Sequence, residues 1–409
     1  MKYAVVTFGC RVNQADSLAL EGRLLARGGV PAPAEEADVV VVNTCSVTAT
    51  ADQGARQTIR RVARTNPAVR VIVTGCYASR APEDLAGLPN VTHVIPNSQK
   101  DNLLDGIADD GWMEAGRFVD GDGPCGGGWL SPGAAGRTAF TLRVQTGCDE
   151  RCSYCIIPTT RGRGRSKPLD DVAAGVRQAV AAGYREIVLT GVHLGSYGCD
   201  LDEPSSLVAL LRRLVTTPED VLFRVSSLEP MDCTPDFVAL AAVSPKIAPH
   251  FHLPLQHGAD TMLRAMRRPY TAAYYRNLVA RIVTLMPHAS IGTDVIVGFP
   301  GETNDDFEEG LALLGQLPLS HLHVFPYSDR PGTEASRRHP KVEGAVIRDR
   351  GRRVREIGAG MTRRFRTAAQ GTTRRALVVD DGWSAVTDNY VKVRLDERGE
   401  RNSWVEVRL

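Results

Sequence analysis

Short apolar runs alternate with helical patterns along most of the 409-residue chain, and this alternation constrains the fold more than any other feature. Residues 1–95 contain three valine-rich runs, KYAVV, DVVVV and RVIVT, with helical patterns over residues 15–27 and 50–65. Strands that alternate with helices predict a parallel sheet with crossover helices. We therefore expect an α/β protein whose first domain, residues 1–112, is built on a parallel sheet.

A second alternating series begins near residue 138. Its six candidate strands are FTLRVQ, EIVLTGV, LFRVSS, HFHLPL, SIGTDVIVGF and HLHVFPYS, with helical patterns between them. Six β-α units predict a partial (β/α)6 barrel that stays open, because closure normally takes eight, with its active site at the carboxyl ends of the strands. We assign residues 138–366 to this domain. Residues 113–137, rich in glycine and proline, are the predicted linker.

The chain becomes strongly basic after the predicted barrel. Residues 337–375 contain 13 Lys and Arg against three acidic residues, a net charge of +10, although the whole chain carries only +2. This stretch favours an amphipathic helix, and the short strand-like runs after it predict a small C-terminal β domain, residues 367–409. An uneven charge distribution of this kind matters more for nucleic-acid binding than the net charge does.

Composition bears on the expected compartment. There is no apolar run of about 18 residues that would predict a transmembrane helix, and the first residues do not resemble a secretory signal. We therefore expect a cytoplasmic protein with no membrane partner. In the reducing cytosol, clustered cysteines are more often metal ligands or catalytic groups than disulfide partners.

Three of the nine cysteines crowd into eight positions as C-x-x-x-C-x-x-C: Cys148, Cys152 and Cys155. A structural zinc site usually has four ligands in two pairs, and no fourth ligand is obvious nearby. A disulfide is disfavoured in the cytosol. Soft thiolates suit an iron–sulfur cluster, and three thiolates on four irons leave one iron open to a small molecule. The spacing favours this third interpretation.

Cys10, Cys45 and Cys76 lie far apart in sequence, yet each follows a predicted strand within four residues. In a parallel sheet the carboxyl ends of the strands meet at one edge, where α/β sheets bind ligands. Three independently buried cysteines are the alternative. The recurrence favours a second four-iron cluster. The remaining cysteines, Cys125, Cys199 and Cys233, share no such pattern and are interpreted as incidental.

The stretches TFGCRVNQADS, VVNTCSVT and VTGCYA, followed by GCDERCSYCIIPTTRGRGRS, resemble the methylthiotransferases, a family of radical S-adenosylmethionine enzymes. The resemblance continues through LTGVHLGSYG, VSSLEP, HLPLQHGADTMLRAMRRPYT, TDVIVGFPGET and VFPYSDRPGT, and so covers nearly the whole chain. It implies two 4Fe-4S clusters and S-adenosylmethionine as cofactors. Cys148, Cys152 and Cys155 would hold the radical-generating, catalytic cluster, and Cys10, Cys45 and Cys76 the cluster that carries sulfur.

The family has branches that differ in substrate. GCRVNQ and RVSSLEP are similar to the branch that acts on N6-threonylcarbamoyladenosine in tRNA, next to the anticodon on its 3′ side. The alternatives are isopentenyladenosine in tRNA and an aspartate of a small-subunit ribosomal protein. A non-catalytic iron–sulfur electron carrier is a further alternative, but it would need neither the barrel nor an open iron. The resemblance implies as partners a tRNA anticodon stem-loop with an ANN-decoding anticodon and an electron donor such as flavodoxin or ferredoxin. We expect a monomer.

The same resemblance and the strand ends suggest further site residues. The candidates for binding S-adenosylmethionine are Tyr154, Gly191, Ser226, Ser227, Glu229 and Gln256. Gly191 could equally mark a tight turn, and His257 could act as a general base, although a hydrogen-bonded structural histidine is commoner.

Arginines beside the cysteine motif and in the basic region could bind RNA phosphates, and one of them could read the substrate carboxylate. The candidates are Arg161, Arg163, Arg165, Arg363, Arg364 and Arg366. The alternative is a solvated loop and a charged surface helix. The tail resembles the TRAM domain, a small RNA-binding β-barrel, but it is shorter than usual, which puts closure of that barrel in doubt.

Overall fold

The computed structural model describes residues 1–104, 131–133 and 137–409 and divides into two compact units. The N-terminal unit comprises the described part of Met1–Leu130 together with Thr146–Asp149 and Ile156–Arg163. The C-terminal unit comprises the described part of Ser131–Gln145, with Glu150–Cys155 and Gly164–Leu409. Most of the predicted linker, including Cys125, lies outside the described residues.

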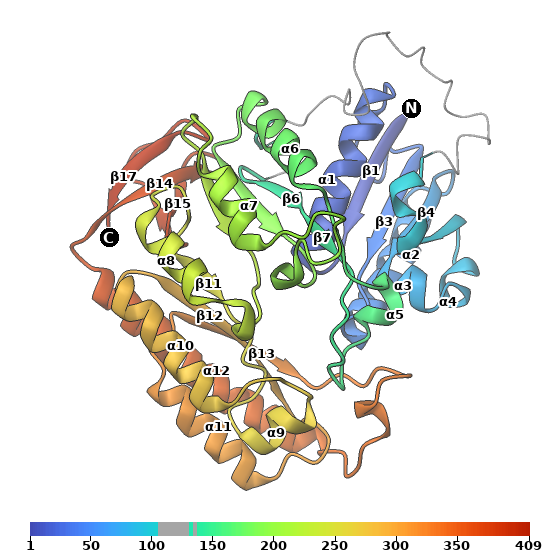
Figure 1. Cartoon of the computed structure of the whole chain (residues 1–409). Helices are drawn as coiled ribbons and strands as arrows, with labels where there is room; N and C mark the ends of the chain where they lie inside the picture. The colour runs from blue at the N-terminus through green and yellow to red at the C-terminus, as the bar shows by residue number, and fades with distance from the viewer. Residues whose placement is uncertain (105–130, 134–136) are drawn as a thin grey trace. The chain divides into compact units, whose positions relative to one another are not determined.

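The N-terminal unit is built on the expected parallel sheet, which can be followed in Figure 1. Its strand order is β2-β1-β3-β4-β5. The strands are β1 (Lys2–Thr7), β2 (Val30–Pro31), β3 (Val39–Thr44), β4 (Arg70–Gly75) and β5 (Val91–Pro96). The helical elements are α1 (Arg11–Ala26), α2 (Ala49–Thr65), α3 (Cys76–Arg80), α4 (Glu83–Ala86), η1 (Asn97–Asn102) and, from the later segment, α5 (Ile157–Arg161).

Alternate residues of β3 supply the two faces of this sheet. Val40 and Val42 pack with Ile59 of α2, whereas Val39 and Val41 pack in a second cluster with Leu24 of α1. Both faces are therefore apolar, as is typical of a parallel strand covered by helices on each side.

Six parallel strands form the C-terminal unit. They are β6 (Phe140–Arg143), β9 (Glu186–Thr190), β10 (Leu222–Val225), β11 (His250–His252), β12 (Ser290–Val297) and β13 (His321–Pro326). They pair as β10-β9-β6 and β11-β12-β13, and isolated bridges such as Ser227↔His252 link the two sheets. No described residue pairs β6 with β13, so the six strands form the expected partial barrel rather than a closed one.

Helices follow the strands in the order that the sequence predicts. They are α6 (Leu169–Ala181), α7 (Leu207–Leu214), α8 (Pro235–Val243), α9 (Asp260–Ala265), α10 (Ala272–Leu285), α11 (Asn304–Gln316) and α12 (Gly344–Ala369). The short elements are β7 (Gln145–Thr146), β8 (Arg165–Ser166), η3 (Leu194–Ser196), η4 (Pro230–Asp232) and η5 (Ala335–Arg337). β11 ends earlier than the run HFHLPL predicts, because Pro254 has no N–H for a ladder hydrogen bond. None of the helices described is long and apolar enough to cross a membrane.

The tail forms a small antiparallel sheet of order β16-β15-β14-β17. Its strands are β14 (Thr373–Val379), β15 (Ser384–Thr387), β16 (Lys392–Arg394) and β17 (Trp404–Arg408). β16 and β17 are the two edges in this order, so the described strands make an open sheet and not a closed barrel. After β15 the chain reaches the barrel strands: Asp388 accepts a hydrogen bond from Arg224 at 3.0 Å, and the Tyr390 ring lies 4.5 Å from that of His250.

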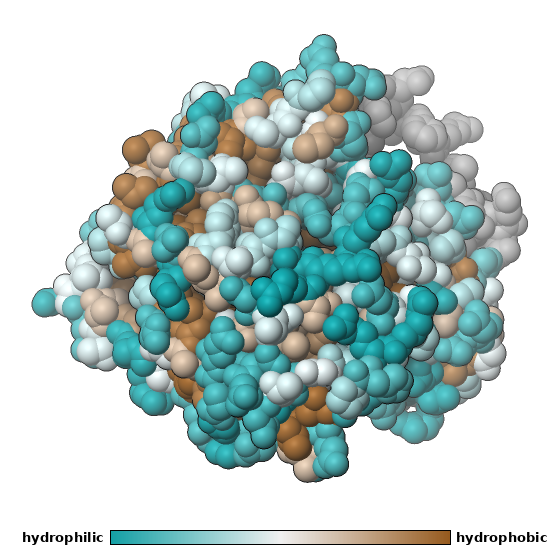
Figure 2. All heavy atoms as spheres, turned by 60° about the horizontal axis from the view of Figure 1, so that its bottom comes forward, coloured by the Kyte–Doolittle hydropathy of each residue, from teal (hydrophilic) through white to brown (hydrophobic). Residues whose placement is uncertain are grey.

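The 26-residue helix α12 accounts for most of the basic stretch. It packs against β13 through small residues, since a side chain at Gly358 would meet Leu322. In Figure 2, which turns the bottom of Figure 1 toward the viewer, hydrophilic residues make up most of the face. Arg363, Arg364 and Arg366 are all exposed on this helix.

Candidate active site

Cys10, Cys45 and Cys76 lie at one edge of the N-terminal sheet. Cys45 directly follows β3 and Cys76 directly follows β4, and the last residues of these strands, Thr44 and Gly75, are paired in register. Cys10 follows β1 and is the residue before the first turn of α1. Parallel strands in register therefore bring three cysteines from distant parts of the sequence to the same edge.

Two glycines let the chain pass close to this edge. Gly9 has a positive φ of +88°, and a Cβ there would lie 2.5 Å from Cβ and 2.6 Å from Sγ of Cys45. Gly75 has a φ of +101°, and a Cβ there would overlap the carbonyl oxygen of Thr44. A side chain at Gly9 would therefore overlap the Cys45 thiol, and one at Gly75 would overlap the end of the neighbouring strand.

A buried network of charged side chains lies beside the three thiols. Asp16 of α1 accepts hydrogen bonds from Lys100 and Arg161, both at 3.0 Å. Lys100 also donates to Asn43 at 2.9 Å, and Arg161 donates to Asn13 at 2.5 Å. All five side chains are buried. The interior of this unit therefore holds one carboxylate that is hydrogen-bonded to two cationic side chains.

Burial and neighbouring charges shift the pKa values of Cys45, Arg161 and Lys100. Burial, followed by the neighbouring thiols and Asp52, raises the pKa of Cys45 to about 12, despite a hydrogen bond from the Val47 amide. Burial alone would lower the pKa of Arg161, but the negative charges of Cys76, Asp16 and Cys10 raise it above its usual value. Burial also lowers the pKa of Lys100, against the opposing charge of Asp16. The Cys45 thiol therefore becomes a thiolate at neutral pH only when a positive group such as a metal replaces its proton.

The surroundings of Cys76 fit a thiolate-ligated iron–sulfur cluster. The side-chain amide of Asn97 donates to Cys76 Sγ at 3.6 Å, and Asn97 Oδ1 and Arg161 Nε are buried without a hydrogen-bond partner among the described residues. An anionic cluster held by thiolates would use all three features of this edge. They are the unpaired polar atoms, the two nearby cations and the three cysteine sulfurs.

Arg161 is not on the exposed surface that its predicted contact with RNA requires. Its side chain is 2% exposed, and its guanidinium is already hydrogen-bonded to Asn13 and Asp16. The physical reason is that α5 begins within the motif after Cys155 and turns this arginine into the protein interior. Arg163 and Arg165 are exposed, as an RNA contact requires, and Arg163 pairs with Asp149 at 3.1 Å.

The segment with Cys152 and Cys155 is anchored in the C-terminal unit by its backbone. Ser153 donates from its amide to Met266 at 3.1 Å and from its hydroxyl to Ala265 at 2.8 Å, and its carbonyl accepts from Ala335 at 2.8 Å. Tyr154 packs against a buried apolar cluster that includes Met262 and Phe299. These contacts fix the two cysteines before any cofactor binds.

Arg268 is a residue of this site that sequence reasoning missed. It donates to Cys152 Sγ at 3.1 Å and to Tyr270 at 3.1 Å, and it pairs with Glu229. Burial would lower the pKa of Arg268, but Tyr154, Tyr270 and Cys152 raise it overall. The arginine therefore stays cationic beside a cysteine that must become a thiolate to bind iron.

The predicted S-adenosylmethionine residues fall at the ends of the barrel strands, but in different environments. Gly191 is tightly packed, because a Cβ there would lie 2.8 Å from Leu194 and 2.9 Å from Gln145. Ser226 is buried and donates to Thr190 at 3.2 Å, whereas Ser227 is exposed. Gln256 adopts a positive φ of 67°, a conformation that is uncommon for residues other than glycine.

His257 is placed away from the inner face of the barrel. It is buried, it lies 3.3 Å from Glu302, and its Nδ1 accepts a hydrogen bond from Ala259 at 3.0 Å. It lines a small cavity with Val297 and Val354, next to α11 and α12. These contacts give it the structural role that is commoner for a histidine.

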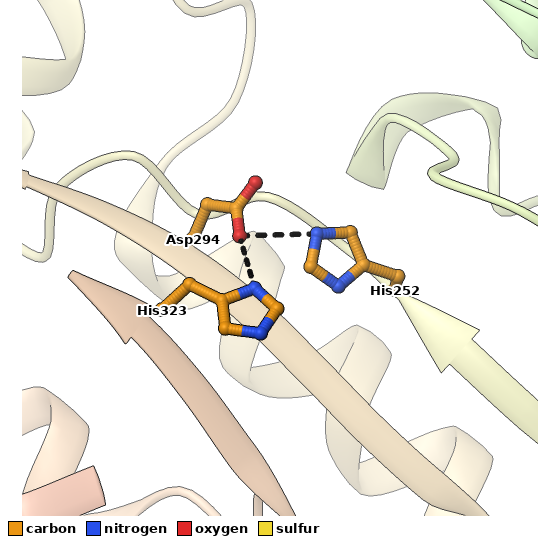
Figure 3. Close-up of side chains that lie close together, drawn as sticks. All are labelled: His252, Asp294 and His323. Atoms are coloured by element: carbon orange, nitrogen blue, oxygen red, sulfur yellow. Dashed lines mark hydrogen bonds and ion pairs between the residues drawn. The ribbon is translucent and has the colours of Figure 1, made fainter. Parts of the chain in front are cut away.

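A third cluster of functional groups, His252, Asp294 and His323, comes from three neighbouring strands (Figure 3). Asp294 Oδ1 lies 3.1 Å from His252 Nε2 and 3.1 Å from His323 Nδ1. We call these residues the His–Asp–His group. Sequence reasoning missed them, although the alternation in HFH, TDV and HLHV could have indicated side chains on one face of a sheet.

Comparison with known proteins places the chain in a family. Residues 2–96 match the model described as "Uncharacterized protein family UPF0004", and residues 142–314 match the Radical SAM superfamily. The chain is 36% identical to "Threonylcarbamoyladenosine tRNA methylthiotransferase MtaB" of Aquifex aeolicus over 100% of both chains. It is 34% identical to the protein of the same name in Bacillus subtilis, over 95% of this chain and 88% of the other.

Other relatives carry a different substrate in their name. The chain is 35% identical to "tRNA-2-methylthio-N(6)-dimethylallyladenosine synthase" of Sorangium cellulosum, over 99% of this chain and 90% of the other. Among solved structures, it is similar to the radical S-adenosylmethionine methyltransferase TsrM of Kitasatospora setae, with a TM-score of 0.57 at 16% identity, over 82% of this chain and 76% of that one. At this identity the likeness concerns the fold alone.

The fold and the full-length relatives define the class: the chain belongs to the radical S-adenosylmethionine methylthiotransferases. It is an enzyme that uses S-adenosylmethionine and 4Fe-4S clusters. Within that class it is a tRNA methylthiotransferase.

Proposed function

We propose that this enzyme converts N6-threonylcarbamoyladenosine, at the tRNA position 3′-adjacent to the anticodon, into its 2-methylthio derivative. The observation that carries the proposal is the match to the Aquifex aeolicus protein of that name over 100% of both chains. The motif GCRVNQ at the first cysteine also supports this branch.

A role follows for each set of cysteines. Cys148, Cys152 and Cys155 hold the cluster that cleaves S-adenosylmethionine. Cys10, Cys45 and Cys76 hold the second cluster, at the edge where Lys100 and Arg161 supply positive charge. When bound, the two clusters supply the electron and the site for sulfur that replacing an aromatic C–H with a C–S bond requires.

The protein's own residues bind, orient and shield the reactants. Tyr154, Gly191, Ser226, Ser227, Glu229 and Gln256 are the residues proposed to bind S-adenosylmethionine. Arg268 holds both Cys152 and the Glu229 carboxylate, and so keeps the first cluster segment and that binding residue in a fixed relation. This positioning is what the protein contributes to a cofactor-driven reaction.

Further partners are proposed on the same basis. The tRNA would offer an anticodon stem-loop with an ANN-decoding anticodon, and a flavodoxin or ferredoxin would deliver electrons. Arg163, Arg165, Arg363, Arg364 and Arg366 are exposed and suited to phosphate contacts. We propose that the enzyme acts as a cytoplasmic monomer.

Isopentenyladenosine in tRNA is the second candidate substrate, since the Sorangium cellulosum relative named for it is 35% identical over 99% of this chain. An aspartate of a small-subunit ribosomal protein is the third. The three differ in which product disappears when the enzyme is missing.

The test is mass spectrometry of nucleosides from total tRNA of a bacterial strain that lacks its own threonylcarbamoyladenosine methylthiotransferase. Expression of this chain should restore 2-methylthio-N6-threonylcarbamoyladenosine. In a strain lacking both tRNA methylthiotransferases, appearance of only the isopentenyl product would reassign the substrate. Appearance of neither product, with reconstituted clusters confirmed, would favour a protein substrate.

Matched cysteine variants test the roles. Cys155→Ala should abolish cleavage of S-adenosylmethionine. Cys76→Ala should retain that cleavage and about half of the iron, but lose methylthio product. Cys199→Ala, at an exposed cysteine interpreted as incidental, is the control and should match the unmodified enzyme.

A further inference from the structure

The His–Asp–His group lies on one face of the sheet β11-β12-β13. Asp294 is directly paired with His323, and His252 is paired with Gly292, which is in turn paired with His321. Laterally paired residues of parallel strands project to the same side, and so do residues two apart along one strand. The three side chains therefore share a face as a consequence of register.

This face is the inner one. The residues that alternate with the group, Leu322 and Val297, lie against α12, at Gly358 and Gly351. Helix α12 therefore covers the opposite side of the sheet, and the His–Asp–His group projects into the barrel. The His321 ring fills the space beside Gly292, because a Cβ at this position would overlap that ring.

The group lies one layer below the segment that carries two of the cluster cysteines. Ile296 follows Asp294 by two residues on the same face of β12, which is a rise of about 7 Å. Ile296 packs against the same buried apolar cluster as Tyr154, the neighbour of Cys155. Active sites of such barrels lie at the carboxyl ends of the strands, and His252 is the last residue of β11.

The contacts with Asp294 engage one nitrogen of each imidazole. Both rings use one nitrogen toward the same oxygen, Asp294 Oδ1, and Figure 3 shows the second nitrogens directed away from that carboxylate. The His323 side chain is 57% exposed, against 13% for His252 and 23% for Asp294. His323 is thus the member that an incoming group would meet first.

A protonated His323 ring can donate a charge-assisted hydrogen bond from its second nitrogen to an anion. The hydrogen bond with Asp294 raises the pKa of His323, and burial opposes this only in part. Although burial alone would raise it, hydrogen bonds from the two histidines lower the pKa of Asp294 to about 2. Asp294 therefore stays ionised, and its hydrogen bond favours the protonated form of His323.

Two arginines of the barrel, Arg224 and Arg268, are already engaged. Arg224 is fully buried and makes two hydrogen bonds with Glu186, at 2.8 Å and 3.0 Å. Arg268 is bonded to Cys152, Glu229 and Tyr270. A carboxylate that enters the barrel would have to displace those partners, whereas His323 offers an exposed ring.

Further imidazole rings lie next to the group. The ring planes of His250 and His321 are nearly parallel, with centroids 6.0 Å apart and an interplanar angle of 3°, and His252 lies 6.1 Å from His321. Nucleobases released from a stem-loop commonly stack on aromatic side chains, histidine included, and the His323 ring is the exposed one in this group.

We propose that the His–Asp–His group is the binding site for the carboxylate on the N6 substituent of the substrate adenosine, with His323 as its direct contact. The inference rests on the proposed function and adds to it the residues that recognise the anionic substituent. Asp294 orients both rings through its Oδ1, which lies 3.1 Å from each of them.

The test compares two RNA substrates with one variant series. The substrates are an anticodon stem-loop with N6-threonylcarbamoyladenosine and the same RNA with the carboxylate masked as its methyl ester. The ratio of their kcat/KM values isolates the contribution of the charge. For the unmodified enzyme we expect the acid to be preferred by about tenfold or more, the usual scale of a charge-assisted hydrogen bond.

His323→Gln should reduce that preference to within about twofold, mainly through a raised KM for the acid. His323→Arg keeps a cation and should retain the preference. His93→Gln, on β5 in the other unit, is the control and should leave the ratio unchanged. Iron content and the electron paramagnetic resonance signal of the reduced clusters verify that each variant is assembled.

The outcomes separate the two proposals. If the unmodified enzyme methylthiolates neither RNA but does modify an isopentenyladenosine stem-loop, the proposed function fails. If it modifies the acid and His323→Gln keeps the same acid preference, only the present inference is overturned. It is also overturned if the enzyme holds about one zinc per chain that His323→Gln removes, because the group would then be a metal centre.

Discussion

Asp16 is predicted to hold the N-terminal unit together when no cluster is bound. Its side chain is 1% exposed and accepts from both Lys100 and Arg161, whose side chains are 7% and 2% exposed. Asp16→Asn removes the carboxylate charge that accepts hydrogen bonds from both cations. Breaking a buried ion pair in this way lowers the free energy of unfolding by about 3–5 kcal/mol. Because the amide oxygen of asparagine can still accept a hydrogen bond, we expect a loss near the lower end, about 3 kcal/mol.

Hydrogen exchange measured by mass spectrometry checks this value locally. At about 1.4 kcal/mol per factor of ten, amides of α1 in the cluster-free protein should exchange about 100-fold faster in Asp16→Asn. Glu36→Gln breaks an exposed pair with Lys2 in the same unit, at 3.7 Å, and should change exchange by less than about fivefold. Reconstitution with iron and sulfide should narrow the difference, since bound thiolates would neutralise the cations. Equal exchange in the two cluster-free variants would refute the reasoning.

Three further predictions concern stability and RNA binding. The pKa of Asp294 is lowered from 3.8 to about 2, so this carboxylate stabilises the folded protein above pH 4, and the stabilisation is lost as the pH falls toward 2. Urea unfolding should show that the free energy of unfolding falls by about 2 kcal/mol over this range, and that this fall is absent in Asp294→Asn. Gly75→Ala should lower stability by about 2 kcal/mol or more in thermal unfolding, because of its positive φ and the Thr44 carbonyl oxygen; an unchanged midpoint would contradict this. Replacing three exposed arginines of α12 by glutamine should weaken tRNA binding and flatten its salt dependence by up to about three units of log–log slope, measured by filter binding. An unchanged slope would remove these residues from the RNA interface: Arg363, Arg364 and Arg366.

The arrangement of strands could be read from the sequence because local patterns encode it. Valine-rich runs gave the parallel sheet, and the cysteines that follow β3 and β4 were expected at one edge, where the pairing of Thr44 with Gly75 places them. The short strand β2 was missed because its two residues, Val30–Pro31, carry no periodic signal.

The side-chain pairings could not be read in the same way. Asp16 meets Lys100 and Arg161 across 84 and 145 residues of sequence, and no periodicity specifies such partners. The basic residues after Cys155 were predicted to contact RNA, with a solvated loop as the alternative, yet α5 ends among them at Arg161 and buries that arginine. For the His–Asp–His group the alternation was present, but only the register of three strands shows that the residues meet.

The two sets of cysteines differ in what must fold before they can act together. Cys148, Cys152 and Cys155 lie within eight positions, so one short segment presents all three as soon as it is synthesised. Cys10, Cys45 and Cys76 are each more than 30 residues from the next and converge only after β1, β3 and β4 have paired. Such long-range closure is slower than local contact formation. On the proposed assignment, delivery of the second cluster must therefore wait for the sheet, and the maturation of this enzyme has an order that is set by chain topology.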